Sequence, residues 1–274
     1  MPCLSIAHLP TGVPVPELPE VERAARRLRR VAVGRQIAGI ELLHPALQRQ
    51  VSALDVASLA GRAIVAVEQQ AKHQRIVLDD GRSLHIHFRM AGDWDFGRSD
   101  HALPRHARAV IVLGDGGRVT LVDPRALSTI QIFAAGDAPN ARLGPDPFSK
   151  QFTSDWLGAA LKRRRGAIKP VLLDQGVVAG VGNIYAAEAL WEARISPRAI
   201  ASKLSAARRL ALVDAIRAVL RRGRGTRSRY NDAFEGRFRV YDRAGEACPR
   251  CDTTIRRITQ AGRSTYYCPR CQAR

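Results

Sequence analysis

Four cysteines near the C-terminus have a spacing that suits a metal ion. They form two pairs, Cys248-x2-Cys251 and Cys268-x2-Cys271, with sixteen residues between the pairs. Such pairs place four thiolates around one ion, and a full set of thiolates leaves zinc no open position for a substrate. The alternatives are two disulfides or redox-active dithiols, and an enzyme-like intracellular chain disfavours disulfides. The pattern therefore predicts one structural Zn²⁺ ion.

A pair of glycines precedes an apolar helical pattern in the second half of the chain. Gly180 and Gly182 let the backbone pass close to another group, and Asn183 is the predicted N-cap of the helix. Exposed N–H groups at that helix start would bind a phosphate oxygen. A glycine pair before a helix is more often a plain turn, but Lys169 and the basic run 162–165 favour phosphate.

Prolines and carboxylates gather in Pro16–Glu22, which reads Pro-Glu-Leu-Pro-Glu-Val-Glu. An internal proline nitrogen is a tertiary amide without a usable lone pair, so Pro16 can react as an amine only if the chain begins there. The preceding residues have three prolines, no periodicity and no signal-peptide pattern. We therefore expect 1–15 to be a leader from a misassigned or processed start, with Val15 read from a GTG start codon.

The elements that must position these residues change along the chain. Apolar residues recur at helical spacing from Pro19 to Val33, and short β-rich runs separated by turns fill 34–133. These runs predict a sandwich or barrel built from two antiparallel sheets. The segment 143–147 is a predicted linker, and helical patterns dominate from 154 to about 222.

A β-hairpin is predicted between the two cysteine pairs. Its arms are 254–258 and 264–267, and its turn is 260–263. Arg263 in the turn is placed to donate two hydrogen bonds to a phosphate, although an isolated turn arginine is more often solvated.

The positive charge is concentrated in the second half of the chain. The net charge is +19, and residues 141–274 hold 27 Lys and Arg against 11 Asp and Glu, whereas residues 1–140 hold 17 against 14. This asymmetry indicates a polyanionic partner, with nucleic acid first, and a basic surface without a specific partner is the alternative. No run of eighteen apolar residues is present, so a membrane span is not expected.

Six motifs in order resemble the bacterial formamidopyrimidine-DNA glycosylases (the Fpg/Nei family) from Pro16 to Arg274. They are Pro16–Glu22, the Lys72 of Ala71–His73, His87–Gly92 (His-Phe-Arg-Met-Ala-Gly), Asp123–Arg125 (Asp-Pro-Arg), Val181–Tyr185 (Val-Gly-Asn-Ile-Tyr) and the cysteine pairs.

The resemblance implies an α+β fold in three parts. These are a catalytic two-sheet antiparallel β-sandwich with an N-terminal helix in 16–140, a helical helix-two-turn-helix domain in 141–237, and a zinc-ribbon β-hairpin in 238–274. It also implies a monomer in the bacterial cytoplasm, associated with the nucleoid, that acts on damaged double-stranded DNA and not on membranes.

The resemblance implies a bifunctional glycosylase and AP lyase for oxidised purines, which flips the target nucleotide out of the duplex. The amine of Pro16 would displace the base and form an imine with C1′. Glu17 would be the general acid and base, and Glu20 would line the lesion pocket. Lys72, which would neutralise a flanking phosphate, and Arg263 complete the implied catalytic set.

Further residues are implied to bind DNA. Lys169, Asn183 and Arg263 would contact the phosphate backbone, Met90 and Arg125 would fill the gap left by the flipped base, and His87 and His106 would add contacts. Taken singly, a methionine is more often a core residue, a lysine is more often solvated, and carboxylates at a helix start are common.

The chain departs from the family pattern at two further points. Leu127 stands where the family has an aromatic wedge, which predicts weaker stacking and a relaxed opposite-base preference. The loop 225–236 is shorter than the family's lesion-capping loop, so formamidopyrimidines are as well suited as 8-oxoguanine. Leu18 favours the purine branch over the oxidised-pyrimidine branch, which remains an alternative together with a non-catalytic DNA-binding protein.

Overall fold

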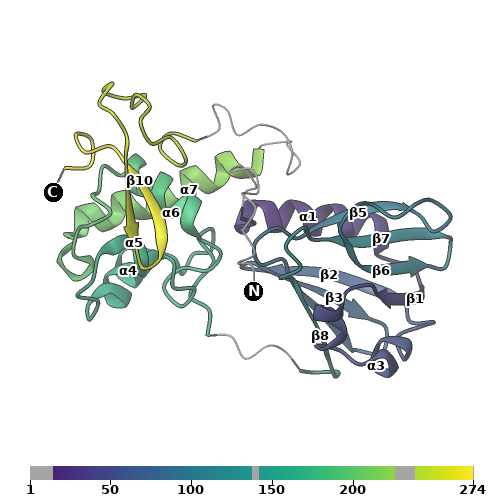
Figure 1. Cartoon of the computed structure of the whole chain (residues 1–274). Helices are drawn as coiled ribbons and strands as arrows, with labels where there is room; N and C mark the ends of the chain where they lie inside the picture. Colours follow the sequence, from purple (N-terminus) through teal and green to yellow (C-terminus); the bar gives the residue numbers. More distant parts are fainter. Residues whose placement is uncertain (1–14, 138–141, 226–237, 274) are drawn as a thin grey trace, which may run out of the picture.

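A lobe of strands and a lobe of helices lie side by side, and helix α1 lies along the strand lobe with its first turn towards the helical lobe (Figure 1). The computed structural model describes residues 15–137, 142–225 and 238–273. The strand lobe holds two antiparallel four-stranded sheets, ordered β1-β6-β7-β5 and β2-β3-β4-β8. Its elements are α1 (Leu18–Ala32), β1 (Ile37–Leu42), α2 (Pro45–Gln48), α3 (Ala53–Ala57), β2 (Ile64–Gln70), β3 (His73–Leu78), β4 (Ser83–His87), β5 (Asp93–Arg98), β6 (Ala107–Leu113), β7 (Gly117–Val122) and β8 (Thr129–Phe133). The predicted two-sheet sandwich is thus confirmed.

Helix α1 belongs to both lobes. Val21, Ala24, Ala25 and Leu28 lie in the apolar core between the sheets, as their helical spacing predicts. Leu18, at the start of the helix, packs instead into the core of the helical lobe. The first turn of α1 therefore lies where the two lobes meet, and its residues face both of them.

The helical lobe packs around the apolar helix α6. Its elements are α4 (Ser154–Leu161), α5 (Ile168–Leu172), α6 (Asn183–Glu192), the 3-10 helix η1 (Ala201–Lys203) and α7 (Ala206–Gly225). Eight of the ten residues of α6 are buried, because the helix is covered by its neighbours on most sides. No helix in the described part of the chain is long and apolar enough to cross a membrane.

The cysteine pairs flank a two-stranded hairpin, β9 (Arg256–Gln260) and β10 (Arg263–Tyr267). The hairpin is one or two residues off its predicted position, because the loop consists of Ala261 and Gly262 alone. Both have positive φ, at 47° and 71°, which is the backbone of a tight two-residue hairpin turn. Gln260 and Arg263 face each other as the last strand pair.

Two short helices interrupt the region in which we predicted only strands. Helices α2 and α3 lie between β1 and β2, and each has a local cap: His44 accepts from the backbone N–H of Ala46, and Ser52 from that of Asp55. The described residues do not include the first fourteen, Cys3 among them, or nearly all of the loop 225–236.

A buried carboxylate ties α6 to the chain that leads into the zinc ribbon. Glu188 is 4% exposed, and it accepts hydrogen bonds of 2.9 Å from the backbone N–H groups of Arg239, Val240 and Tyr241. Burial raises the pKa of Glu188, and these three N–H groups act in the opposite direction. The contact replaces water for three donors that have no strand partner.

We expect Glu188→Ala to lower the free energy of unfolding by about 3 kcal/mol, because it leaves buried backbone donors unsatisfied. Glu188→Gln should cost less, since its amide oxygen is still an acceptor. The control is Glu192→Ala on the same helix, which removes only an exposed ion pair with Arg222 and should cost less than about 1 kcal/mol. Equal losses for the two alanine variants in urea unfolding would contradict the role given to Glu188.

Candidate active site

The side chain of Glu17 joins the start of α1 to the start of α6. Glu17 is fully buried. Its carboxylate accepts from the backbone N–H groups of Gly182 at 2.7 Å, Ile184 at 2.8 Å and Tyr185 at 3.2 Å. Burial raises the pKa of this carboxyl, while the Lys72 ammonium and the N–H groups act in the opposite direction. The N-terminus of α6 therefore binds an anion, and that anion is a side chain of the protein itself.

The glycines before α6 are required by this contact. A Cβ at Gly182 would lie 2.4 Å from Cδ of Glu17 and 2.7 Å from Nζ of Lys72, and Gly180 has a φ of +82° beside Leu18. The prediction that Asn183 caps the helix is wrong: Gly182 is the N-cap and Asn183 is the first helical residue. Glu17 occupies the N–H groups that we expected to be open to phosphate.

Lys72 lies beside Glu17 and comes from the tight turn between β2 and β3. Its ammonium donates to the carbonyl oxygen of Val181 at 3.0 Å. Burial lowers the pKa of Lys72, the Glu17 carboxylate opposes that shift, and the Arg263 guanidinium adds to it. Glu17, Lys72 and Val181 are far apart in the sequence and thus converge at the junction of the lobes.

Lys169 and Asn183 connect the helices to the zinc-ribbon hairpin. The ammonium of Lys169 donates to Oδ1 of Asn183, to Oγ1 of Thr265 at 2.8 Å and to the carbonyl of Ser264 at 3.2 Å. Asn183 donates to the same Ser264 carbonyl at 3.1 Å. Burial lowers the pKa of Lys169 to about 8, opposed by Glu17 and reinforced by Arg263. In the free protein both side chains are therefore held in place by internal partners.

Pro16 and Glu20 complete the site at the start of α1. Pro16 is buried and directly precedes Glu17, whose backbone N–H donates to Oε2 of Glu20 at 3.2 Å. Oε1 of Glu20 accepts from the hydroxyl of Tyr185 at 3.0 Å. Pro16 therefore directly precedes the buried carboxylate that interacts with Lys72.

Histidines form a stack on the strands that follow Lys72. His73 and His87 are cross-strand partners with ring centroids 4.5 Å apart, and His85 stacks on His73 at 4.8 Å. Burial is the first cause that lowers the pKa of His73 to about 4 and that of His87 to about 3, and His85, Arg89 and Lys72 add to it. These rings are neutral at pH 7.

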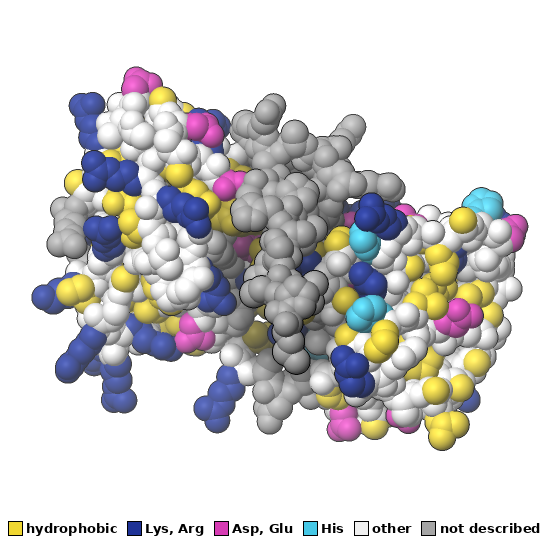
Figure 2. Space-filling model, viewed as in Figure 1, with side chains coloured by type: hydrophobic (Ala, Val, Ile, Leu, Met, Phe, Trp, Pro, Cys, Tyr) yellow, Lys and Arg dark blue, Asp and Glu magenta, His cyan; other side chains and the backbone are white. Residues whose placement is uncertain are grey.

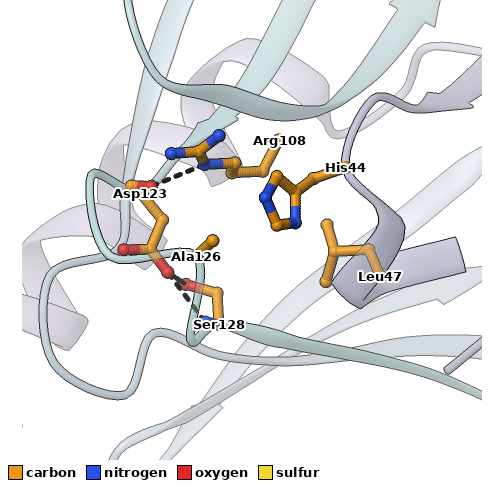
Figure 3. A pocket seen from close by; sticks show the side chains of 6 residues that line it. All are labelled: His44, Leu47, Arg108, Asp123, Ala126 and Ser128. Atoms are coloured by element: carbon orange, nitrogen blue, oxygen red, sulfur yellow. Dashed lines mark hydrogen bonds between the residues drawn. The ribbon is translucent and has the colours of Figure 1, made fainter. Parts of the chain in front are cut away.

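The carboxylate of Asp123 shapes the loop that carries Arg125, one of the predicted DNA-binding residues. Asp123 accepts from the backbone N–H groups of Arg125 and Ser128 at 2.9 and 2.7 Å, and from Oγ of Ser128 at 2.8 Å. Figure 3 shows this carboxylate beside Ser128, and Arg108 donating to the carbonyl oxygen of Asp123.

The same loop anchors its two neighbours. The Ser128 hydroxyl also lies 3.2 Å from the carbonyl oxygen of Phe88, which is a second acceptor for its single proton. The N–H of Asp123 donates to the carbonyl of His106 at 3.0 Å. Met90 is 36% exposed and Arg125 is exposed, so both side chains stand out from this framework. The loops that carry them are joined where Ser128 meets the carbonyl of Phe88.

The four cysteines converge as their spacing predicts. Their sulfurs lie within 4.8 Å of one another, which suits tetrahedral coordination of one Zn²⁺ ion by four thiolates.

No role was predicted from the sequence for two residues that have clear contacts in the structure. Tyr185, whose hydroxyl binds Glu20, and Gln175, whose amide bonds to Gly180 and Val181, depend on contacts that no local periodicity encodes.

Basic side chains cover the lobe that holds these helices and the ribbon. Figure 2 shows dark blue Lys and Arg side chains over much of that lobe, with fewer acidic ones between them. The charge excess of 141–274 is therefore displayed on the surface, on the lobe that also holds Lys169 and Asn183.

Three family models match consecutive parts of the chain. They are the formamidopyrimidine-DNA glycosylase N-terminal domain over residues 15–130, the formamidopyrimidine-DNA glycosylase H2TH domain over 143–229, and the zinc finger found in FPG and IleRS over 245–274.

Curated relatives and solved structures agree with these models. The formamidopyrimidine-DNA glycosylase of Roseiflexus sp. is 40% identical over 94% of this chain and 100% of its own length, and that of Paracoccus denitrificans is 39% identical with the same coverage. MutM in complex with DNA containing carbocyclic 8-oxo-G matches with a TM-score of 0.88 at 30% identity. Lactococcus lactis Fpg in complex with abasic-site DNA matches with a TM-score of 0.88 at 28% identity, and both structures cover 94% of this chain and 100% of their own. The chain therefore belongs to the formamidopyrimidine-DNA glycosylase family.

Proposed function

We propose that this protein is a bifunctional DNA glycosylase and AP lyase of base excision repair, which excises oxidised purines from duplex DNA. The substrates are formamidopyrimidines and 8-oxoguanine. The observation that carries the proposal is the convergence of Pro16, Glu17 and Lys72 at the junction of two lobes, one of them strongly basic. An amine, a buried proton carrier and a cation are the three groups that this chemistry requires.

The free secondary amine of Pro16 attacks C1′ of the flipped nucleotide. As the bond from Pro16 to C1′ forms, the C1′–N bond to the base breaks and the base leaves with a proton from the neutral form of Glu17. The nitrogen of Pro16 then gives up its own proton and O4′ takes up a proton as the C1′–O4′ bond breaks, which opens the sugar and leaves an iminium between Pro16 and C1′. The iminium acidifies the C2′ proton, and its removal by Glu17 drives elimination of the 3′ phosphate, which cuts the strand. Burial supports the role of Glu17 as proton carrier because it raises the pKa of the carboxyl. A carboxyl with a raised pKa can more easily both accept and donate a proton.

The DNA backbone is bound by the cations of both lobes. Lys72, Lys169 and Arg263 surround the glycine turn, and Asn183 lies beside Lys169. His87 and His106 add contacts from the strand lobe. Because Lys169 and Asn183 already bind each other in the free protein, DNA binding exchanges at least one of these internal hydrogen bonds for a phosphate contact.

Met90 and Arg125 enter the space that the flipped base leaves, since both stand out from loops joined through Asp123 and Ser128. Leu127 is 46% exposed in the same loop. An aliphatic side chain there stacks less well on a base than an aromatic ring does, which supports a relaxed opposite-base preference.

We further propose that residues 16–140, 141–237 and 238–274 are the three functional parts, acting as a monomer on the nucleoid in the bacterial cytoplasm. The alternative function is a non-catalytic protein that binds damaged or abasic DNA. It applies to a form of the chain that retains Val15, because the nitrogen of Pro16 is then an amide.

Borohydride reduction of the imine tests the nucleophile. A chain that begins at Pro16 should become covalently attached to abasic-site DNA, whereas the chain that retains Met1 should not, because an amide nitrogen forms no imine. The matched control begins with one glycine before Pro16 and differs by a single residue. Peptide mapping of the trapped product locates the bond. Attachment at any residue other than Pro16 would reject the mechanism, and no trapping by the short chain would favour the binding protein.

Lys72→Ala should slow single-turnover cleavage of a lesion by about a hundredfold, because a preorganised charge beside the reacting group is removed. Its affinity for undamaged duplex should fall much less. Lys203→Ala, which removes one positive charge from an exposed lysine outside the basic run, is the control and should leave cleavage near the parent rate. Parallel losses of cleavage and of affinity for undamaged DNA would reduce Lys72 to a general electrostatic contact.

A further inference from the structure

The last turn of α6 contacts the first cysteine pair through one side chain, Trp191. This tryptophan is 6% exposed, and its indole N–H donates to Sγ of Cys248 at a distance of 3.4 Å. The ring packs in an apolar cluster with Val240, Ile255 and Cys268. A buried N–H so placed has the sulfur as its partner, and the sulfur is a predicted zinc ligand.

Arg250 holds the same indole from a second side. It lies between Cys248 and Cys251 in the sequence, its guanidinium carbon is 3.9 Å from the ring centroid of Trp191, and its Nη1 donates to the carbonyl of Trp191 at 3.0 Å. The first cysteine pair is thus fixed to α6 by three contacts with one residue.

The second cysteine pair is also attached to the chain near the end of α6. Gln272 accepts from the backbone N–H of Cys268 at 2.9 Å and donates to the carbonyl of Ile195 at 3.0 Å, just beyond the end of α6. That contact uses backbone groups and leaves the sulfurs untouched. Among the described residues, Trp191 is the side chain outside the ribbon for which a hydrogen bond to a cysteine sulfur is observed.

Charge gives this hydrogen bond its importance. Four thiolates around one Zn²⁺ carry a net charge of −2, and a buried cluster with that charge is stabilised by donors that point at its sulfurs. The indole N–H reduces the electron density on Cys248, and the Arg250 guanidinium supplies positive charge against the same ring. Both favour the metal-bound, deprotonated state of the cluster.

We propose that the indole N–H of Trp191 helps to retain the zinc ion by donating a hydrogen bond to the Cys248 thiolate, which binds the metal. Trp191 itself does not bind the metal. Trp191 is a positioning residue: it is 6% exposed and acts through the sulfur of Cys248. Its place in the fold is significant because α6 binds Glu17 at its other end, so the metal site and the reactive site are attached to the same buried helix.

The test compares two conservative variants of the full chain. Trp191→Phe keeps an aromatic ring under Arg250 and removes only the N–H. Trp156→Phe is the matched control, because its indole N–H donates to a backbone carbonyl, that of Val177, at 3.0 Å. Zinc release to an excess of chromogenic chelator should be about tenfold faster for Trp191→Phe and unchanged for Trp156→Phe.

A spectroscopic measurement separates the hydrogen bond from packing. In the Co²⁺-substituted protein, the thiolate-to-cobalt charge-transfer band should move to longer wavelength in Trp191→Phe, because the sulfur becomes more electron-rich. The band should not move in Trp156→Phe. Release and band position that are both unchanged in Trp191→Phe would overturn the proposal.

The unaltered protein provides a test that no folding defect can obscure. With ¹¹³Cd in place of zinc and ¹⁵N-labelled tryptophan, one of the three indole protons should show a splitting by ¹¹³Cd, transmitted through the N–H···S–Cd path. The chain contains three tryptophans, so the other two serve as internal controls. Absence of a splitting at Trp191 would show that the N–H does not bind the ligand sulfur, and would overturn the proposal.

Discussion

The burial of one carboxylate, that of Glu17, is the constraint on which the arrangement of the lobes depends. A charged group without water is stable only with close partners, and those of Glu17 come from α6 and from the turn before β3. Satisfying the carboxylate therefore fixes the first turn of α1 against the helical lobe and against Lys72 together. This close contact requires glycine at positions 180 and 182, because a side chain at either position would collide with α1 or with the carboxylate.

Patterns that are local in the sequence predicted the elements well. The helical spacing of 19–33 corresponds to α1 within a residue, the period of the β-rich runs gave two antiparallel sheets, and the cysteine spacing gave a set of converging sulfurs. Short helices with their own caps, such as α3, were missed because they are too brief for periodicity to register.

The predictions that failed depend on partners that are distant in the sequence. Asn183 has the right residue type for a cap, yet the carboxylate of Glu17, 165 residues before Gly182, binds the same helix start. Asn183 bonds instead to Lys169 and the ribbon. Lys169 likewise has partners that no local pattern reveals: it is 1% exposed and bonded to three oxygens, two of them in the ribbon hairpin. Such competition between partners is decided by the fold and cannot be derived from either segment alone.

The position of Leu18 in the core of the helical lobe has a consequence for the order of events on the ribosome. Domains fold as they emerge during translation, the N-terminal ones first, and the two sheets are complete once Phe133 has left the exit tunnel. The first turn of α1 cannot settle then, because the residues that enclose Leu18 and bind Glu17 come from segments translated later, among them α6 and α7. In a nascent or prematurely terminated chain the partners of Leu18 and Glu17 are absent, so the site proposed around Glu17 forms only after the helical lobe has been synthesised.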